Sequence, residues 1–326
     1  MNPIKNLSRL VLAGTVAVSG MVAAQENISG YPERPVTWIV PFDAGGGADT
    51  WTRIIASEAE SVWGESFIVQ NQPGQGGVRG WQSVLGEPND GYTIIHASPT
   101  PIITLLSQEN PPIEPSDIRI VGFLGSYENV IASKPADPWA TWDELVSYAK
   151  ENPGQLTIGG TNAPLLAAAF LFDQAGVDAT FIPYSGSGAA TTDFLGGHID
   201  LLVTTTTSGV ALLPNEATLV VNTSDEQLPQ NTVDQINDMG ASVPPTATDL
   251  GFEGFSYPRW VGVQPQTPDE LIIEISRLLE ELMSNDVVKD KIAKAGEEVN
   301  YIGYEEAQTR YDRLVEDLKT SVQLLQ

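Results

Sequence analysis

A short apolar run, a glycine triplet and an amphipathic helix follow one another near the start of this chain, and their order constrains the fold most. Residues 36–42 are apolar and β-branched up to Pro41, which predicts a buried strand. Large apolar side chains recur at helical spacing over residues 51–63. Glycines occupy positions 45–47 between the two, and we expect Asp49 to cap the helix. Such a turn directs free N–H groups toward one point, so it predicts an anion site, with a plain βα turn as the alternative.

The first 24 residues have the pattern of an export signal. Lys5 and Arg9 precede an apolar run at 10–22, and small residues at 22–24 form a cleavage site. The apolar run is too short for a membrane span, and an uncleaved anchor is the alternative. We therefore expect cleavage after Ala24 and a soluble mature protein in the periplasm.

The composition is strongly acidic and lacks cysteine. There are 42 acidic and 16 basic residues, which gives a net charge of −26. Nucleic acid is a poor partner for such a surface, and disulfides, thiol chemistry and a lipid-modified cysteine are excluded. An anionic ligand would have to be held by local dipoles against an unfavourable overall field.

Strands and helices alternate in two blocks, which predicts mostly parallel sheets flanked by helices. The first block has further strands at 66–71, 92–96 and 118–124. The second has helices at 141–150, 165–175 and 189–195 between strands at 155–159, 179–184, 199–205 and 218–223.

Two candidate crossing strands, at 127–133 and 259–263, connect these blocks. Capping boxes at Thr141 and Thr267 predict helix starts, whereas residues 227–248 have weak periodicity and are expected at the surface. We expect an α/β fold of two lobes with a cleft between them, and ligands beyond the carboxyl ends of the strands. The predicted divisions are a signal peptide at 1–24, a first lobe of 25–130 with 256–326, and a second lobe of 131–255.

Catalytic constellations are hard to assemble from these residues. The chain has two histidines, His96 at a strand end and His198 in a glycine turn, and neither a nucleophile elbow nor a zinc-binding His pair occurs. The glycine-rich segments do not give a dinucleotide fingerprint in frame. We expect no cofactor and no metal. An exported enzyme using Asp49, His96 or Ser98 and a sensory receptor remain as alternatives.

Ordered motifs along nearly the whole mature chain resemble the extracytoplasmic solute receptors of tripartite tricarboxylate transporters, the Bug or TctC family. The first lobe contributes Tyr31-Pro-x-Arg-Pro-Val, Ile39-Val-Pro-Phe-x-Ala-Gly-Gly-Gly-x-Asp49 with Arg53, Val69-x-Asn-x-Pro-Gly-x-Gly-Gly-x-x-Gly80 and Pro88-x-Asp-Gly-Tyr-Thr93. Later matches are Pro153-Gly-x-Leu156, Pro183-Tyr-x-Gly-Ser187, Leu195-Gly-Gly-x-x-Asp200, Pro245-Thr, Leu250-Gly-Phe-x-Gly-Phe255, Trp260-x-Gly262 and Thr267-Pro268.

The resemblance implies a periplasmic-binding-protein-like (type II) receptor that closes over a small organic carboxylate, such as a di- or tricarboxylate or an aromatic acid. It also implies membrane permease subunits as partners, and we expect a monomer. In that family the two glycine turns of the first lobe clamp one carboxylate and the second lobe sets specificity. Here the second lobe departs from the pattern, because a histidine that the family usually shows is absent from residues 159–165.

The candidate ligand-binding residues come from four places in the chain. We expect Gly76→Val to weaken binding with the fold retained, because a Cβ would block approach of the backbone to the ligand. The candidates are Ala44, Gly45, Gly46, Gly47 and Asp49 of the first turn, Pro73, Gly74, Gln75, Gly76 and Gly77 of the second, Ser98, and Thr161, Asn162, Tyr184, Ser185, Gly186, Thr204 and Thr205 of the second lobe.

Overall fold

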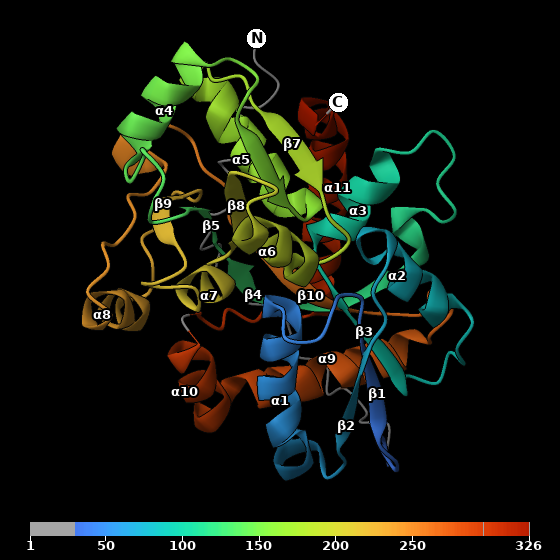
Figure 1. Ribbon diagram of the computed structural model, residues 1–326. Helices are drawn as coiled ribbons and strands as arrows, with labels where there is room; N and C mark the ends of the chain where they lie inside the picture. The colour runs from blue at the N-terminus through green and yellow to red at the C-terminus, as the bar shows by residue number, and fades with distance from the viewer. Residues whose placement is uncertain (1–29, 296, 326) are drawn as a thin grey trace.

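Two five-stranded sheets, each flanked by helices, form the molecule (Figure 1). The computed structural model describes residues 30–295 and 297–325. The predicted signal peptide and its cleavage site at Ala24 lie outside these residues. None of the helices in the described ranges is long and apolar enough to cross a membrane.

The first sheet is formed by both ends of the described chain. It contains β1 (Val36–Val40), β2 (Phe67–Asn71), β3 (Thr93–Ala97), β4 (Arg119–Tyr127) and β10 (Tyr257–Val263), in the order β2-β1-β3-β10-β4. Strands β1, β2 and β3 run parallel, and β10 is antiparallel to both of its neighbours. The core on one face is shared by α1 (Gly47–Trp63), α9 (Asp269–Ser284) and α10 (Asp286–Lys294). The opposite face packs against α2 (Val78–Leu85), α3 (Pro99–Leu106) and α11 (Tyr304–Ser321).

The second sheet repeats this plan with one antiparallel strand between parallel ones. It contains β5 (Asn129–Ser133), β6 (Thr157–Gly160), β7 (Thr180–Pro183), β8 (Leu201–Thr205) and β9 (Thr218–Asn222), in the order β7-β6-β8-β5-β9. Strand β5 is antiparallel to β8 and β9. Apolar side chains of α4 (Trp142–Glu151) and α5 (Asn162–Ala175) cover one face, and α6 (Ser187–Gly196), α7 (Thr206–Val210) and α8 (Gln230–Asp238) cover the other.

The chain crosses between the sheets twice. A single residue, Glu128, separates β4 from β5, and the return runs from the end of β9 to the start of β10. Both crossings lead into the antiparallel strand of the sheet that they enter. The predicted α/β class with two flanked sheets is confirmed, and the predicted lobe boundary at residue 130 falls inside β5.

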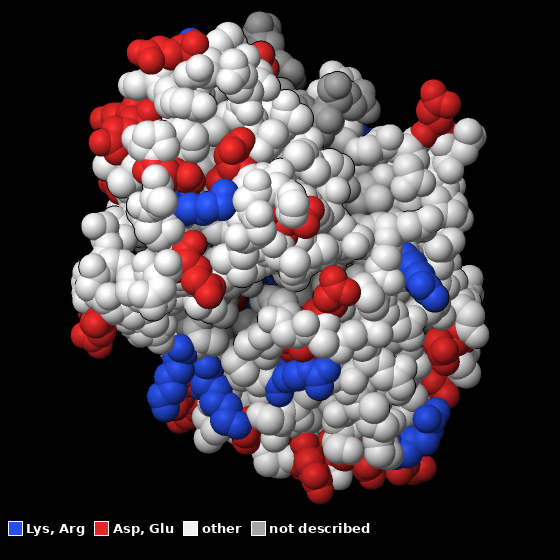
Figure 2. All heavy atoms as spheres, in the orientation of Figure 1, with Lys and Arg blue, Asp and Glu red and all other residues white. Residues whose placement is uncertain are grey.

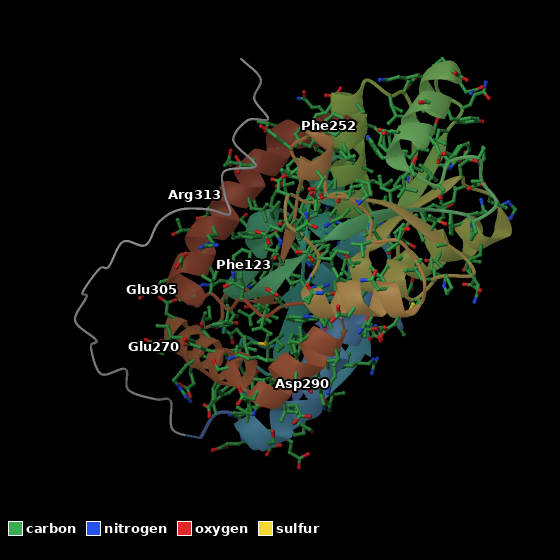
Figure 3. The ribbon with its side chains drawn as sticks, turned by 90° about the vertical axis from the view of Figure 1, so that its left-hand side faces the viewer. Phe123, Phe252, Glu270, Asp290, Glu305 and Arg313 are labelled. Carbon is green, nitrogen blue, oxygen red and sulfur yellow. The ribbon has the colours of Figure 1, made fainter. Side chains whose placement is uncertain are left out.

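Apolar packing joins the two halves on one side. Ala163, Leu166, Ala167 and Phe170 of α5 belong to the same core cluster as side chains of α3 and α11. Figure 3 shows the C-terminal helices along the flank of the molecule, with Glu270, Asp290, Glu305 and Arg313 exposed on their outer side. The halves are therefore held together along α5.

Three helices are absent from the sequence-based prediction. Helix α3 begins at Pro99 and contains Pro101, and proline is well tolerated in a first helical turn. Helix α8 lies within residues 227–248, and its short apolar face buries Thr232 and Ile236. Helix α7 begins at Thr206, so it contains the last two of the four consecutive threonines at 204–207, which were expected at the end of a strand.

One predicted capping box is correct and the other is wrong. At α4, Thr141 accepts from the N–H of Glu144, and the Glu144 carboxylate accepts in return from the Thr141 N–H. Helix α9 instead begins at Asp269, with Pro268 as its N-cap. The Thr267 hydroxyl donates to the carbonyl of Gln264, so it closes the preceding turn and does not cap the helix.

Candidate functional site

Two adjoining pockets lie between the sheets. The inner pocket is small, about 50 Å³, and is lined by the starts of several helices. The outer pocket is about 390 Å³ and lies between the second glycine turn and α3 on one side and the end of β7 and the start of α5 on the other. Thr161 lines the inner pocket and the next residue, Asn162, lines the outer one, so the two pockets are parts of one cleft. Figure 2 shows the face hollowed where the halves meet.

The inner pocket lies where the N-termini of four helices converge. Gly46, Gly47 and Ala48 begin α1, Ser98 precedes α3, Thr161 precedes α5, and Ser187 begins α6. None of these four described helices has a side-chain cap hydrogen bond. N–H groups of a first helical turn have no acceptor within their own helix, and the helix dipole is positive there. The pocket is therefore suited to an anion, without needing a free basic side chain.

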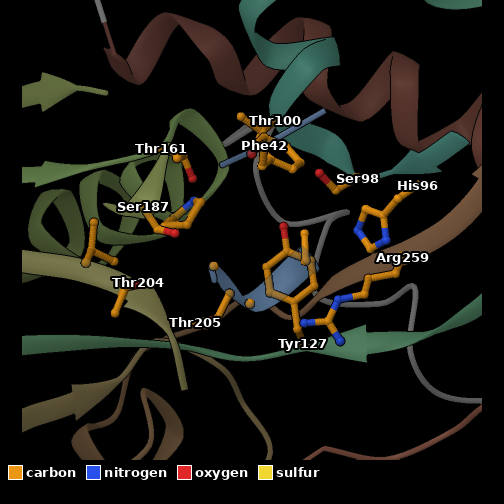
Figure 4. A pocket seen from close by; sticks show the side chains of 15 residues that line it. Phe42, His96, Ser98, Thr100, Tyr127, Thr161, Ser187, Thr204, Thr205 and Arg259 are labelled. Carbon is orange, nitrogen blue, oxygen red and sulfur yellow. The ribbon is translucent and has the colours of Figure 1, made fainter. Parts of the chain in front are cut away.

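Hydroxyl groups surround this point (Figure 4). Ser98, Thr100 and Tyr127 come from the first half, whereas Thr161, Ser187, Thr204 and Thr205 come from the second. Thr204 is 2% exposed, and its Oγ1 has no hydrogen-bond partner within the described part of the chain. A buried hydroxyl without a partner is costly, which makes Thr204 a candidate donor for a ligand in the pocket.

A buried arginine forms one wall of the inner pocket. Arg259 of β10 lies between the rings of Trp51 and Tyr127, with its Cζ 5.0 and 4.7 Å from their centroids. Its Nη2 donates to Glu297 Oε1 at 2.9 Å. Burial lowers the pKa of Arg259 to about 10, against the influence of Tyr127 and Glu128. The side chain is thus charged at neutral pH, and its charge is balanced by Glu297.

His96 contributes an acceptor nitrogen to the same pocket. The Thr52 hydroxyl donates to the Ala48 carbonyl at 2.8 Å, so it has no second hydrogen to give. Its 3.1 Å contact with His96 Nδ1 must then be donated by the histidine. Burial lowers the pKa of His96 to about 3, and Arg259 lowers it further than Asp49 raises it. His96 is therefore neutral, with Nε2 as an acceptor.

Asp49 supports the first glycine turn from behind, and its predicted role as a helix cap is wrong. The N-cap of α1 is Gly46. Asp49, in the first turn, accepts from the Gly45 N–H at 2.8 Å and also from Arg53 and Asn71. Burial raises the pKa of Asp49, but the hydrogen bonds from Arg53, Gly45 and Asn71 outweigh this and hold it below its usual value. The carboxylate thus uses one amide of the turn that was expected to face the ligand.

The second glycine turn borders the outer pocket and not the inner one. Four consecutive residues, 74–77, have positive φ angles, from 49° at Gln75 to 132° at Gly74. Only Gln75 and Gly76 line the outer pocket, and the Gly77 N–H is bonded to the Gly74 carbonyl. A Cβ on Gly76 would overlap the hydroxyl of Thr104. A valine at position 76 is therefore expected to strain the backbone as well as the pocket, so a change in binding alone would not isolate a role in the site.

The predicted site residues divide between three locations. The prediction missed Arg259, Tyr127, Thr100 and Ser187; two of these left a signal, Ser187 as the end of a family motif and Arg259 as a basic residue heading an apolar strand. Gly46, Gly47, Ser98, Thr161, Thr204 and Thr205 line the inner pocket, Gln75, Gly76, Asn162, Tyr184 and Ser185 line the outer pocket, and Ala44, Gly45, Asp49, Pro73, Gly74, Gly77 and Gly186 line neither.

The two halves touch at the first glycine turn. A Cβ on Gly47 would lie 2.6 Å from the Thr205 hydroxyl, and one on Gly46 would lie 2.9 Å from the Ser187 hydroxyl. Across the same gap, Asn162 donates to Thr104 at 2.7 Å. Glycine is therefore required at 46 and 47 for the halves to approach this closely, and the structure shows the cleft closed.

The candidate enzymatic groups do not form a relay. No hydrogen bond joins His96 to Ser98 or Asp49 within residues 30–295. Among all residues that the structure describes, no group of three His, Cys, Asp or Glu side chains could hold a metal ion.

Comparisons with known proteins agree with this geometry. The model of a family described as "Tripartite tricarboxylate transporter family receptor" matches residues 51–325. The UPF0065 protein in the tcbD-tcbE intergenic region of Pseudomonas sp. (strain P51) is 30% identical over 262 residues, covering 78% of this chain and 75% of that protein. The periplasmic binding protein BugD has a TM-score of 0.78 at 25% identity, covering 89% of this chain and 97% of that one. An R. palustris protein solved with adipate has a TM-score of 0.80 at 23% identity, with 90% and 98% covered.

Proposed function

This chain belongs to the tripartite tricarboxylate transporter receptor family, and we propose that it captures a small organic carboxylate in the inner pocket and delivers it to a membrane permease. The observation that carries this proposal is the convergence of four helix N-termini on one buried point. A carboxylate accepts hydrogen bonds from several N–H and O–H donors at once, and charge-assisted bonds of this kind are strong. The unpartnered hydroxyl of Thr204 supplies a further donor.

Several other assignments form part of the same proposal. The chain is exported with cleavage after Ala24, acts as a periplasmic monomer, and meets the permease subunits of a tripartite transporter. Its moving units are the two lobes, 25–130 with 256–326 and 131–255. Closure of the lobes over the acid brings Thr205 and Ser187 to the α1 N-terminus, and opening releases the acid.

We propose that the bound acid leaves chemically unchanged. Burial lowers the pKa of His96 to about 3, so it is a weak base, and no hydrogen bond joins it to the Ser98 hydroxyl within residues 30–295. The Asp49 carboxylate is engaged by Gly45, Arg53 and Asn71. These contacts support a receptor over an enzyme.

The proposal is tested by screening the purified mature chain against organic acids. Titration calorimetry and thermal unfolding should identify at least one carboxylate that binds and raises Tm, since a ligand of the native state stabilises it. Mass spectrometry after long incubation should recover that acid unaltered. If no acid in a broad panel binds, or if the bound acid is converted, the proposal is wrong.

A further inference from the structure

The two pockets differ in size, and this difference indicates which end of a ligand each pocket holds. A cavity needs about 10–15 Å³ of such volume to hold one water molecule, so the inner pocket, about 50 Å³, has room for only a few heavy atoms. One carboxylate group fits this space. The body of the acid then lies in the outer pocket, which has about 390 Å³.

The outer pocket has no counter-charge for a second carboxylate. None of the described residues that line it is Lys, Arg, Asp or Glu, and Phe181, Leu165 and Pro183 make part of its wall apolar. Tyr184 is neutral, because burial and Asp193 raise its pKa to about 12. Its hydroxyl donates to Asp193 at 2.7 Å, so the residue behind this part of the wall is acidic.

An acidic residue lies at the junction of the two pockets. Gly186 is flanked by Ser185, which lines the outer pocket, and by Ser187, which lines the inner one. The Asp43 carboxylate reaches across from the first glycine turn and packs against Gly186 so closely that a Cβ there would overlap Oδ2. Asp43 itself lines neither pocket, but its carboxylate lies against the residue that links the two, so a ligand spanning both pockets would pass close to it.

The inner pocket also lacks a surplus of positive charge. Arg259 is its only basic lining residue in the described chain, and the buried Glu297 pairs with it. The helix N-termini supply partial charges suited to one carboxylate. With a chain charge of −26, a second carboxylate would meet a repulsive overall field without a basic lining residue to offset it.

We propose, building on the carboxylate site above, that the cleft selects acids with a single negative charge and a neutral body, and that Asp43 rejects a second carboxylate. Asp43 is thus a specificity residue. The structural neighbour from R. palustris was solved with adipate, a dicarboxylate, so a matched comparison with adipate is informative.

The experiment measures binding of acid pairs that differ by one carboxylate, hexanoate against adipate and benzoate against terephthalate. At least one monocarboxylate should bind on the order of tenfold tighter than its partner at neutral pH, as expected for like charges within several ångströms near a surface. Equal or tighter binding of the dicarboxylates would overturn the inference while leaving the proposed function intact. Failure of all four acids and of the wider panel would instead refute the proposed function.

The Asp43→Asn variant tests whether this side chain causes the preference for monocarboxylates. The variant should reduce the preference for the monocarboxylate by on the order of tenfold, chiefly by improving dicarboxylate binding. Asp238→Asn is the matched control, because it makes the same change of charge on an exposed residue at the end of α8. The control should keep the wild-type ratio. An unchanged ratio in Asp43→Asn, or an equal change in both variants, would show that Asp43 does not select the ligand.

Discussion

Replacing Thr204 by valine should change ligand binding without reducing the stability of the fold. The two side chains have nearly the same shape, and the hydroxyl that is lost is 2% exposed and lacks a partner in the described part of the chain. A buried hydroxyl without a hydrogen bond costs about 1–3 kcal/mol. Thr204→Val should therefore leave the free energy of unfolding unchanged or raise it by about 1 kcal/mol, which corresponds to a Tm increase of about 2 °C.

Binding should change in the opposite direction. A hydrogen bond to a charged acceptor contributes about 1.5–3 kcal/mol, so loss of the donor should raise the Kd of the captured acid by about tenfold or more. Calorimetric titration gives the Kd, and thermal unfolding without and with the acid gives the two stabilities. The variant should thus be as stable as the wild type alone but less stabilised by ligand.

Thr232→Val provides the matched control for this experiment. Thr232 is also buried, and its Oγ1 also lacks a partner among described residues, but it lies in α8 and lines neither pocket. The control should match Thr204→Val in stability and keep the wild-type Kd. If Thr204→Val unfolds more easily while its Kd is unchanged, the hydroxyl serves the fold and the argument for its role is refuted.

Three further predictions concern the residues around the cleft. The pKa of His96 is about 3 in the folded chain and 6.5 as its ordinary value, so the unfolded chain binds the proton first and stability falls as pH drops through this window. His96→Gln should therefore reduce the loss of unfolding free energy between pH 6.5 and 4.5 by about 2 kcal/mol. An equal loss in both proteins would contradict this. Gly76→Ala should lower the free energy of unfolding by at least about 1 kcal/mol, because φ is +58° and the new Cβ would overlap the Thr104 hydroxyl. In the control Gly188→Ala the new Cβ meets open space, so stability should not fall. Equal Tm values for the two variants would refute this difference. Asp49→Asn should lower the free energy of unfolding by about 1–3 kcal/mol and weaken acid binding, because it loosens the hydrogen bonds that hold the first glycine turn. An unchanged urea denaturation curve would show that Asp49 does not stabilise this turn.

The sequence alone predicted the features that depend on neighbours along the chain. The alternation of apolar strands and amphipathic helices, the glycine turn before α1 and the capping box at Thr141 are all local patterns, and the structure contains them. Helix α3 was missed because its two prolines are a loop signal everywhere except in a first helical turn. The motif order also indicated the family, which the family model confirms over residues 51–325.

Only the tertiary structure decided which helix starts meet. Sequence reasoning put both glycine turns at one ligand group, whereas packing places the first at the inner pocket and the second at the outer one. It likewise could not place Arg259 against Glu297, or Asp43 against Gly186, because each pair joins segments far apart in the chain. Local sequence determines backbone geometry through sterics and short-range hydrogen bonds, whereas contacts between distant segments follow from how the whole core packs and which buried charges find partners. The glycine turns could therefore be predicted from the sequence, whereas the set of residues that forms the site could not.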